Sequence, residues 1–377
     1  MNIINSKKAD FLIVGCGLAG ATFARLAAES GKSVHIIDSR NHIGGNCFTY
    51  KDEETSIEVH KYGPHIFHTN SKIIWEFINR FSSFYSYIHR VKANYRGCIY
   101  SLPINLHTIN QFFNKTFTPN EAESFIESIK IKKDQVENFE DYILTSLGEE
   151  LYNAFFRDYT IKQWGKDPKE IPVSTAKRLP IRFNYNDNYF NDIYQGIPTD
   201  GYTGIFKRML DHLNIKIFLN TGFDEFKNTW RNNYTKLIFS GSIDNYFDYR
   251  FGYLPYRTVS FKEIRGTEIL GTAIINFTDL SVPYTRIHEH KWFTPEKVVK
   301  KSIAFEEYSN STNSLFEPYY PIRNLESESL FKKYQDLSLQ EKDVVFIGRL
   351  AEFRYYDMHQ VIASSISKFK QIAGIEV

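Results

Sequence analysis

The run FLIVGCGLAGATFA near the start of the chain constrains the fold more than any other stretch. Its apolar residues are typical of a β-strand, and Gly15, Gly17 and Gly20 then form a G-x-G-x-x-G turn that opens a helix. Gly31 ends this helix, and SVHII predicts a second strand that closes at Asp38. This order, a strand, a glycine turn, a helix and a second strand that ends at an acidic residue, predicts a βαβ unit that binds FAD or NAD.

Each position of the turn has a physical task. Gly15 allows the tight turn, Gly17 lets backbone approach a pyrophosphate, and Gly20 lets helix and strand pack closely. The N–H groups that open the helix can bind phosphates, and Asp38 can accept hydrogen bonds from ribose hydroxyls. The pair Gly44–Gly45 follows in SRNHIGGNCF, an arrangement that resembles flavoproteins of the amine-oxidase and mutase type. It favours FAD, with an ordinary Gly-Gly turn as the alternative.

Length and composition set further limits. At 377 residues the chain exceeds one ordinary core, which predicts two or three domains. A formal charge of +2 gives no electrostatic reason to expect a nucleic-acid or membrane partner. The 3 cysteines show no pairing pattern, which favours a reducing cytoplasm. Lys7 and Lys8 precede the first apolar run as in a signal peptide, but glycines interrupt that run. No other segment approaches the ~20 apolar residues that span a bilayer.

The rest of the chain divides into helical and β-rich stretches. Residues 85–178 are typical of helices, with a capping box at Thr118, and residues 246–293 are rich in β-formers. The segment 343–350 predicts a strand that returns to the first module before a final helix. We predict an α/β (mixed α+β) fold with a discontinuous Rossmann-like FAD domain, a helical-bundle domain and an antiparallel β-sheet domain. The predicted boundaries are 1–84, 196–245 and 338–377 for the FAD domain, 85–178 for the helical domain, and 179–195 with 246–337 for the sheet domain.

Several segments together resemble one family over nearly the whole chain, the prokaryotic UDP-galactopyranose mutases. The segments occur in the family's order: GCGLAG, RNHIGGN, HKYGPHIFHTN, YTIKQWGKDPKEIP, RLPIRFNYNDNYF, YQGIP, IDNYFDYRFG, INFTD, VPYTRIHEHK, EPYYPIRN and GRLAEFRYYDMHQVI. The resemblance implies a cytoplasmic enzyme that uses reduced FAD to convert UDP-galactopyranose to UDP-galactofuranose without net redox change. It also implies a flavin N5–sugar adduct, a product that feeds polysaccharide biosynthesis, and a possible homodimer.

The resemblance further implies roles for individual residues. Those implied in catalysis are His68, Arg286, Arg178 and Asp357. Those implied in substrate binding are Phe155, Tyr159, Trp164, Arg178, Tyr189, Arg257, Arg286, Tyr320, Tyr355 and His65. Those implied in FAD binding are Gly15, Gly17, Leu18, Ala19, Gly20, Asp38, Ser39, Gly45, Asn46, His65, Ile66, Arg349, Asp357 and Met358.

Physical chemistry supports these roles and leaves alternatives open. Trp164 can stack on a planar base, whereas core packing explains Phe155 equally well. Guanidinium groups suit two phosphates better than ammonium groups, although a surface ion pair is the alternative for each arginine. The segment 160–180 carries Trp164 and Arg178 among glycine and prolines, so we expect a mobile lid that excludes water.

Three histidines lie within nine residues, at His60, His65 and His68. No carboxylate or cysteine cluster accompanies them, and Gly63–Pro64 breaks any regular ligand face, so we expect no metal. By the resemblance His65 and His68 lie near sugar and flavin, and we interpret His60 as structural.

Three positions depart from the galactose mutases: Asp200, Ile193 and His288. They leave the identity of the substrate sugar undecided, because one buried contact can decide between such substrates. The alternatives to UDP-galactopyranose are dTDP-fucopyranose and UDP-N-acetylgalactosamine. Rival interpretations are an FAD-dependent amine-oxidase-like enzyme and a non-catalytic sugar-nucleotide-binding protein.

Overall fold

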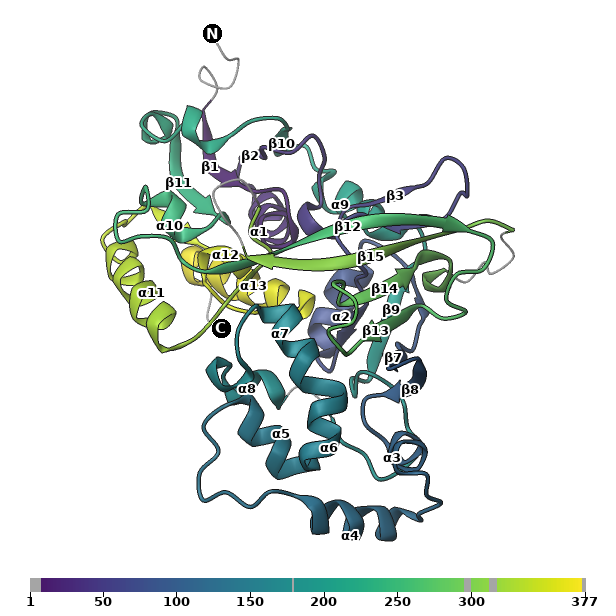
Figure 1. Ribbon diagram of the computed structural model, residues 1–377. Coiled ribbons are helices and arrows are strands. Elements are labelled where there is room, and N and C mark those ends of the chain that lie inside the picture. The colour runs from purple at the N-terminus through teal and green to yellow at the C-terminus, as the bar shows by residue number, and fades with distance from the viewer. Residues whose placement is uncertain (1–7, 178–179, 295–299, 312–316, 375–377) are drawn as a thin grey trace.

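The computed structural model describes residues 8–177, 180–294, 300–311 and 317–374. Two sheets and a group of helices organise it. In Figure 1 the first sheet and its covering helices lie at the upper left, a long β-ribbon crosses the middle, and the helices α4 to α8 lie at the bottom.

The first sheet has five parallel strands in the order β10-β2-β1-β11-β17. They are β1 (Ala9–Val14), β2 (Val34–Ile37), β10 (Ile215–Phe218), β11 (Tyr234–Phe239) and β17 (Val344–Phe346). The central strand β1 is buried on both faces, with Leu12 and Ile13 fully inaccessible, as parallel strands between layers require. Helices α1 (Leu18–Glu29) and α13 (Met358–Ala373) pack together beside it. Three distant parts of the chain therefore build one nucleotide-binding sheet, and the predicted discontinuous Rossmann-like fold is confirmed.

The second sheet has seven strands in the order β16-β12-β15-β14-β13-β7-β8. They are β7 (Val91–Tyr95), β8 (Cys98–Leu102), β12 (Tyr256–Gly266), β13 (Ile274–Phe277), β14 (Arg286–Glu289), β15 (Ser302–Ser311) and β16 (Tyr320–Pro321). Every pair is antiparallel except β13 with β7. The predicted antiparallel sheet is confirmed.

The expectation of helix from residue 85 was wrong for residues 91–102. They form the hairpin β7–β8 on the edge of the second sheet. Arg96 and Gly97 at its tip have φ of 52° and 82°, the signature of a tight hairpin turn that matches strand twist. The three-domain boundaries given above stay a prediction.

Two small sheets attach the histidine segment to the rest. One has the order β5-β9-β6, and the other pairs β3 with β4. Their strands are β3 (Thr49–Lys51), β4 (Glu58–His60), β5 (Phe67–Thr69), β6 (Phe84–Ser86) and β9 (Tyr194–Pro198). In the register of β5 and β9, His68 lies opposite Gln195.

The lower helices of Figure 1 enclose a core of their own. They are α3 (Leu106–Phe113), α4 (Pro119–Ile129), α5 (Phe139–Leu147), α6 (Glu149–Tyr152), α7 (Asp158–Trp164) and α8 (Val173–Ala176). The predicted capping box at Thr118 starts α4, with proline at its first position. A π-helical turn, Asn153–Arg157, joins α6 to α7, so one continuous helical path carries a local insertion.

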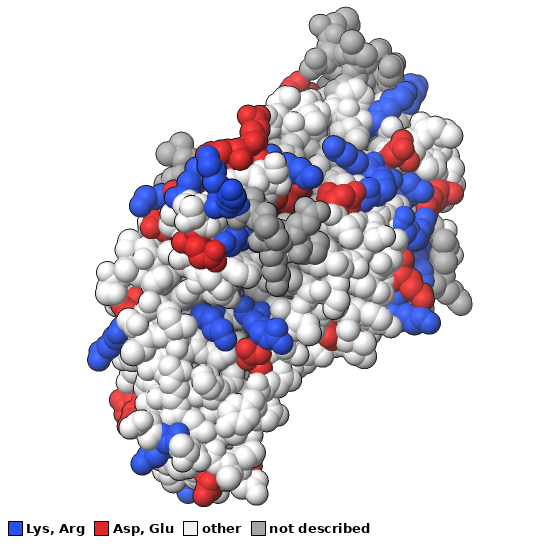
Figure 2. Space-filling view, turned by 90° about the vertical axis from the view of Figure 1, so that its right-hand side faces the viewer, with Lys and Arg blue, Asp and Glu red and all other residues white. Residues whose placement is uncertain are grey.

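The other helices lie outside this lower group. They are α2 (Lys72–Asn79), α9 (Gly201–Leu210), α10 (Ile243–Tyr246), α11 (Leu325–Ser338) and α12 (Gly348–Ala351). On the face shown in Figure 2, basic and acidic side chains are interspersed. Within the described ranges, no helix combines the length and apolar character needed to span a membrane.

Candidate active site

The turn between β1 and α1 is packed too tightly for a side chain at two of its three glycines. Gly15 has a φ of +99°, and a Cβ added there would lie 2.1 Å from Oγ of Ser240. A Cβ on Gly20 would lie 2.0 Å from the carbonyl oxygen of Gly15. Glycine at both positions therefore lets α1 start directly against β1.

Gly17 is different, because the protein itself leaves room for a side chain there. A Cβ on Gly17 would meet only the Cα of Gly45, at 3.7 Å, and its φ of −82° suits any residue. Gly17 is also the N-cap of α1, where backbone N–H groups lack partners within the helix. A phosphate that approaches these groups needs the space that a Cβ would fill. The residues present therefore fit a bound dinucleotide.

Asp38 connects the glycine turn to the end of β2. Its Oδ2 accepts a hydrogen bond from the backbone N–H of Cys16 at 2.7 Å, and its Oδ1 accepts one from the N–H of Arg40 at 2.9 Å. A carboxylate has further lone pairs, which can accept hydrogen bonds from ribose hydroxyls. Arg40 also bonds to Oδ1 of Asn46 at 2.9 Å, so the second glycine segment is fixed beside the first.

The residues predicted to bind FAD fall into two groups. In or beside the glycine turn lie Gly15, Gly17, Leu18, Ala19, Gly20, Asp38, Ser39 and Gly45. Around the cavity described next lie Asn46, His65, Ile66, Arg349, Asp357 and Met358. Asn46 directly follows Gly45, so the two groups meet there.

A cavity of about 730 Å³ lies where the second sheet, the histidine segment, the lower helices and the start of α13 meet. It extends from Asn46 to the helix α7 and the strands β14 and β15. The predicted substrate residues that line it are His65, Phe155, Tyr159, Trp164, Tyr189, Arg286, Tyr320 and Tyr355, and the predicted catalytic residue His68 lines it too. Its size falls within the range of small-molecule sites in proteins.

Three aromatic side chains form one wall of the cavity. The ring centroid of Trp164 lies 5.4 Å from that of Tyr320 and 5.9 Å from that of Tyr355, and the two tyrosine rings are 5.4 Å apart. Burial raises the pKa of Tyr320 to about 12, and burial also raises the pKa of Tyr159. Both hydroxyls stay protonated and can donate hydrogen bonds to phosphate oxygens.

Arg286 brings a fixed positive charge to the cavity. It lies opposite Glu307 across β14 and β15, and Nη2 of Arg286 is 2.7 Å from Oε1 of Glu307. Burial opposes the charge, but the Glu307 carboxylate outweighs burial and raises the pKa of Arg286 well above its usual value. Among the described residues, none accepts a hydrogen bond from the buried Nε of Arg286. The guanidinium therefore keeps a donor for an anionic ligand.

Arg349 also lines the cavity. Its Nη1 donates to the carbonyl oxygen of Tyr319 at 3.3 Å, and its guanidinium carbon lies 5.4 Å from the ring centroid of Tyr355. Asp357 is the N-cap of α13, and its N–H donates to Oε1 of Gln360 at 2.9 Å. The N-terminus of α13 therefore opens onto the cavity beside Arg349.

The histidine segment forms part of the cavity and part of a buried cluster. Nδ1 of His65 bonds to the carbonyl oxygen of Gly63 at 2.8 Å, and burial together with the charges of Arg349 and Arg286 lowers the pKa of His65 to about 4. His60 is buried and accepts a hydrogen bond from the N–H of His65 at 3.0 Å, a packing role. In the described ranges, no group of three or more His, Cys, Asp or Glu side chains is placed to hold a metal.

Besides Arg286, two further arginines, Arg257 and Arg178, were predicted to bind the substrate. Arg257, predicted to lie near the sugar, does not line the cavity. Its buried guanidinium instead bonds to the carbonyl oxygen of Gln163 at 3.0 Å and to Oγ of Ser309 and Ser311 at 3.1 and 2.9 Å. It joins α7 to the second sheet, and its role in substrate binding stays a prediction. Arg178 lies outside the described residues, and its role stays a prediction.

Phe155 packs in the helical core as well as at the cavity. Its ring centroid lies 5.1 Å from that of Tyr100 and 5.5 Å from that of Phe112. Both interpretations of this residue are therefore compatible with its position.

The cavity also contains side chains that sequence reasoning missed: Gln163, Asn276, Glu307, Asp192 and His89. Buried atoms without a protein hydrogen-bond partner in the described ranges include Oδ1 of Asn276 and Nδ1 of His89. Gln163, Asn276 and Asp192 lie within or just after segments that carried the resemblance, YTIKQWG, INFTD and FNYNDNYF, so their neighbours gave a signal. Glu307 lies in an ordinary strand, and no local pattern distinguishes it.

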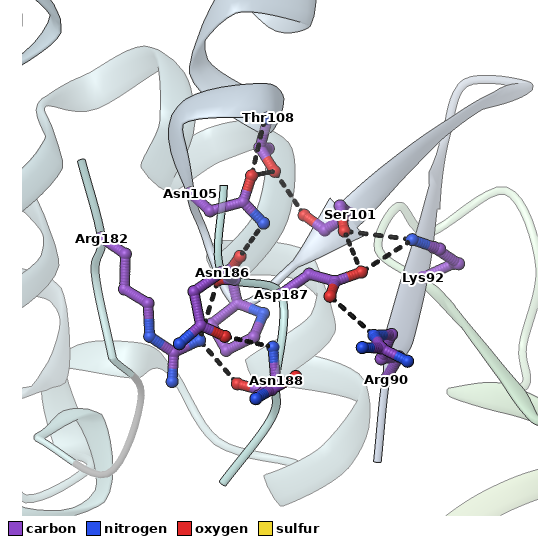
Figure 3. Close-up of polar contacts among 10 residues, drawn as sticks. Arg90, Lys92, Ser101, Asn105, Thr108, Arg182, Asn186, Asp187 and Asn188 are labelled. Carbon is purple, nitrogen blue, oxygen red and sulfur yellow. Dashed lines mark hydrogen bonds and ion pairs between the residues drawn. The ribbon is translucent and has the colours of Figure 1, made fainter. Parts of the chain in front are cut away.

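Figure 3 shows how the segment that precedes Asp192 is held. Asp187 points towards the strand β7, where its carboxylate bonds to Nε of Arg90 at 2.8 Å and lies 3.5 Å from Nζ of Lys92. Arg182 donates to the carbonyl oxygens of Asn186 and Asn188. These contacts tie residues 182–188 to one another and to β7, and Arg90, Lys92 and Asp187 do not line the cavity.

The fold and the site together define an FAD-type dinucleotide-binding enzyme with an adjoining substrate cavity. The sequence matches the family model of UDP-galactopyranose mutase over residues 154–355 and that of an NAD(P)-binding Rossmann-like domain over residues 13–81. The chain belongs to the UDP-galactopyranose mutase family.

Curated relatives support this assignment over the whole length. A dTDP-fucopyranose mutase of Escherichia coli is 46% identical, over 94% of this chain and 96% of that protein. A probable UDP-galactopyranose mutase of Klebsiella pneumoniae is 45% identical, over 95% of this chain and 93% of that protein. A crystal structure of reduced UDP-galactopyranose mutase shares the fold with a TM-score of 0.74 and 16% identity, over 97% of this chain and 96% of that chain.

Proposed function

We propose that this protein is a flavin-dependent mutase that interconverts the pyranose and furanose forms of a nucleotide sugar, with UDP-galactopyranose as the first candidate substrate. The observation that carries the proposal is the single cavity that joins Asn46, beside the glycine turn, to Arg286 and the aromatic wall. A cofactor held at the turn and an anionic nucleotide held at Arg286 would meet in this cavity.

The glycine turn, Asp38 and Arg349 would hold FAD. When bound and reduced, flavin supplies a nucleophilic nitrogen that can replace the nucleoside diphosphate at the anomeric carbon without net redox change. Arg286 binds the diphosphate through the side of its guanidinium that Glu307 leaves free, and the protonated hydroxyls of Tyr159 and Tyr320 donate to phosphate oxygens. Each of these donors is placed by buried contacts, so little reorganisation is needed on binding.

Trp164 and the neighbouring tyrosines exclude water from the reacting sugar. The indole is 9% exposed in the structure, and it packs against Tyr320 and Tyr355. Dry surroundings strengthen the charge–charge contacts of the diphosphate and suppress hydrolysis. We propose that Arg178 adds a second positive charge from the lid segment.

The test is an anaerobic assay of the purified protein after reduction with dithionite. UDP-galactose, UDP-N-acetylgalactosamine and dTDP-fucose are incubated separately, and chromatography follows each pyranose–furanose pair. We expect a furanose product only with reduced flavin, whereas oxidised enzyme is inactive. Oxygen consumption with an amine, without any furanose product, would instead support the amine-oxidase-like alternative.

A second candidate substrate is dTDP-fucopyranose. The dTDP-fucopyranose mutase of Escherichia coli and the probable UDP-galactopyranose mutase of Klebsiella pneumoniae differ by one percentage point in identity to this chain, 46% against 45%. Since identity does not separate them, the kcat/KM values from the assay decide between the two sugars.

We also propose that the enzyme works in the cytoplasm, where activated sugars and reductants are available, and that it forms a homodimer. Light scattering after size-exclusion chromatography tests the dimer, with a monomer mass as the contradicting result.

A further inference from the structure

His68 forms a hydrogen bond at the edge of the cavity with a residue to which no role was assigned. Its Nδ1 lies 2.8 Å from Oδ2 of Asp192. The side chains are 12% and 18% exposed, and both line the cavity. A hydrogen bond from Nδ1–H to a carboxylate fixes which ring nitrogen carries the permanent proton, and it leaves Nε2 at the other side of the ring.

The carboxylate of Asp192 is held in place by its own backbone. The N–H of Ile193 donates to Oδ1 of Asn70 at 2.9 Å, and Nε2 of Gln195 donates to the carbonyl oxygen of Asp192 at 2.7 Å. Gln195 in turn lies opposite His68 in the pairing of β5 with β9. The two partners of this hydrogen bond are therefore connected through the pairing of β5 with β9.

The ring of His68 is also restrained on its face and edge. Phe190 stacks on it with a centroid distance of 3.7 Å and an interplanar angle of 11°, and His359 approaches edge-on at 5.1 Å. Burial and the proximity of His68 lower the pKa of His359, so His359 is neutral and does not compete for the Asp192 carboxylate. Stacking fixes the ring plane, and Asp192 fixes the rotation within that plane.

The proposed reaction needs a group that takes up and returns one proton. When a pyranose becomes a furanose, the C1–O5 bond breaks and O5 gains a proton, whereas the C1–O4 bond forms and O4 loses a proton. The isomerisation has no net change in electrons or protons, so the proton released at O4 balances the one gained at O5. A side chain with one exchangeable proton at a fixed atom suits this transfer.

We propose that Asp192 is a positioning residue for this reaction: it keeps the Nδ1 proton on His68, so that the proton that His68 exchanges is the one at Nε2. The inference rests on the proposed mutase function. It predicts that Asp192 acts on turnover rather than on nucleotide binding, because the carboxylate touches His68 and not Arg286 or the aromatic wall.

Asp192→Asn tests the proposal with nearly unchanged shape. An amide can donate a hydrogen bond to Nδ1, which moves the ring proton of His68 to Nε2. The matched control is Asp187→Asn in the same segment, whose carboxylate pairs with Arg90 and Lys92 instead. Both variants and the wild type are purified with FAD and labelled with ¹⁵N-histidine, and a His68→Gln spectrum identifies the His68 signals among the 11 histidines.

We expect Asp192→Asn to move the His68 signals from the Nδ1–H to the Nε2–H pattern and to lower kcat on the order of 10²-fold. The KM and the FAD content should stay within about twofold of wild type, since binding groups are untouched. Asp187→Asn should leave the His68 signals and kcat near wild type.

The proposal is overturned if Asp192→Asn keeps the Nδ1–H pattern with unchanged kcat, or if Asp187→Asn lowers kcat to the same extent, because either result makes the contact merely structural. Failure of the mutase function is distinguishable. In that case the wild type converts no nucleotide sugar, whereas the nitrogen spectra still show whether Asp192 sets the tautomer of His68.

Discussion

Arg286 and Glu307 face each other across neighbouring strands, with Nη2 and Oε1 2.7 Å apart, and the pair leaves Nε of the guanidinium without an acceptor among the described residues. Nη2 of Arg286 thus binds Glu307, whereas Nε can donate a hydrogen bond to a ligand.

We therefore predict that Arg286→Lys impairs the enzyme although the substitution keeps the positive charge. Lysine keeps the positive charge but lacks the fork that can serve Glu307 and a phosphate together. We expect kcat/KM to fall by about 10²-fold, the equivalent of one or two charged hydrogen bonds. Flavin absorbance should show normal FAD content. Arg90→Lys, in an ion pair outside the cavity, is the control, and an equal loss there would contradict the assignment.

Arg257→Ala should affect stability instead of substrate binding. The buried guanidinium of Arg257 joins Gln163 in α7 to Ser309 and Ser311 in β15, and its removal leaves only the bond from Ser309 to the carbonyl oxygen of Gln163 at 2.6 Å between these three residues. We expect the free energy of unfolding in urea to fall by about 2–4 kcal/mol. The KM of any folded enzyme should change less than that of Arg286→Lys. A large rise in KM at full stability would restore Arg257 to the substrate site.

Alanine substitutions at two glycines of the turn should have different effects, one on cofactor binding and the other on folding. Gly17→Ala adds a methyl group where the protein has space, so we expect an unchanged melting temperature of the FAD-free protein and loss of bound FAD. Gly20→Ala forces a methyl group to within 2.0 Å of the carbonyl oxygen of Gly15 and should destabilise the fold itself. Gly222→Ala, with nothing within 4 Å, is the control. Normal FAD content in Gly17→Ala would exclude a phosphate at this position.

The buried histidines should make stability depend on pH. Burial lowers the pKa of His89 to about 3 and lowers the pKa of His60, His288 and His290 well below 6.5. The unfolded chain then binds more protons than the native state below pH 6.5, so stability falls as the pH drops from about 6.5 towards 4. Urea titrations at several pH values measure this slope, and His89→Asn should reduce it. A flat profile would contradict the burial of these rings as neutral groups.

The three thiols should differ in reactivity. Burial raises the pKa of Cys16 and Cys47 to about 12, whereas Cys98 is exposed. Because the thiolate is the reactive form, a disulfide reagent should modify one thiol of the native protein and all 3 after unfolding. More than one fast-reacting thiol in the native protein would contradict this arrangement.

Local patterns predicted the parts of the fold that local physics determines. The glycine turn and the capping box at Thr118 each follow from residues within a few positions, and both occur as predicted. The hairpin β7–β8 was missed although Arg96–Gly97 offered a turn signal, because its place in the sheet depends on β13, far along the chain.

In the candidate site, too, local sequence did not predict contacts between residues that are far apart in the chain. The resemblance named Arg286 and Trp164, which the fold brings to one cavity. It could not give Glu307 or Asp192, because their partners lie on other strands and only tertiary structure brings them together. The contacts of Arg257 were also missed, because a sequence shows that an arginine is present, not which acceptors surround it.

The π-helical turn Asn153–Arg157 has a consequence for how the cavity wall can change. A helix advances about 100° per residue, so one residue more or fewer in this turn rotates everything that follows in α7 by that angle. Tyr159 and Trp164 would then exchange places with neighbours that now face elsewhere. The number of residues in this turn thus decides which side chains of α7 meet the ligand, so a single deletion would disrupt the wall where a substitution at exposed Asn153 or Arg157 is tolerable.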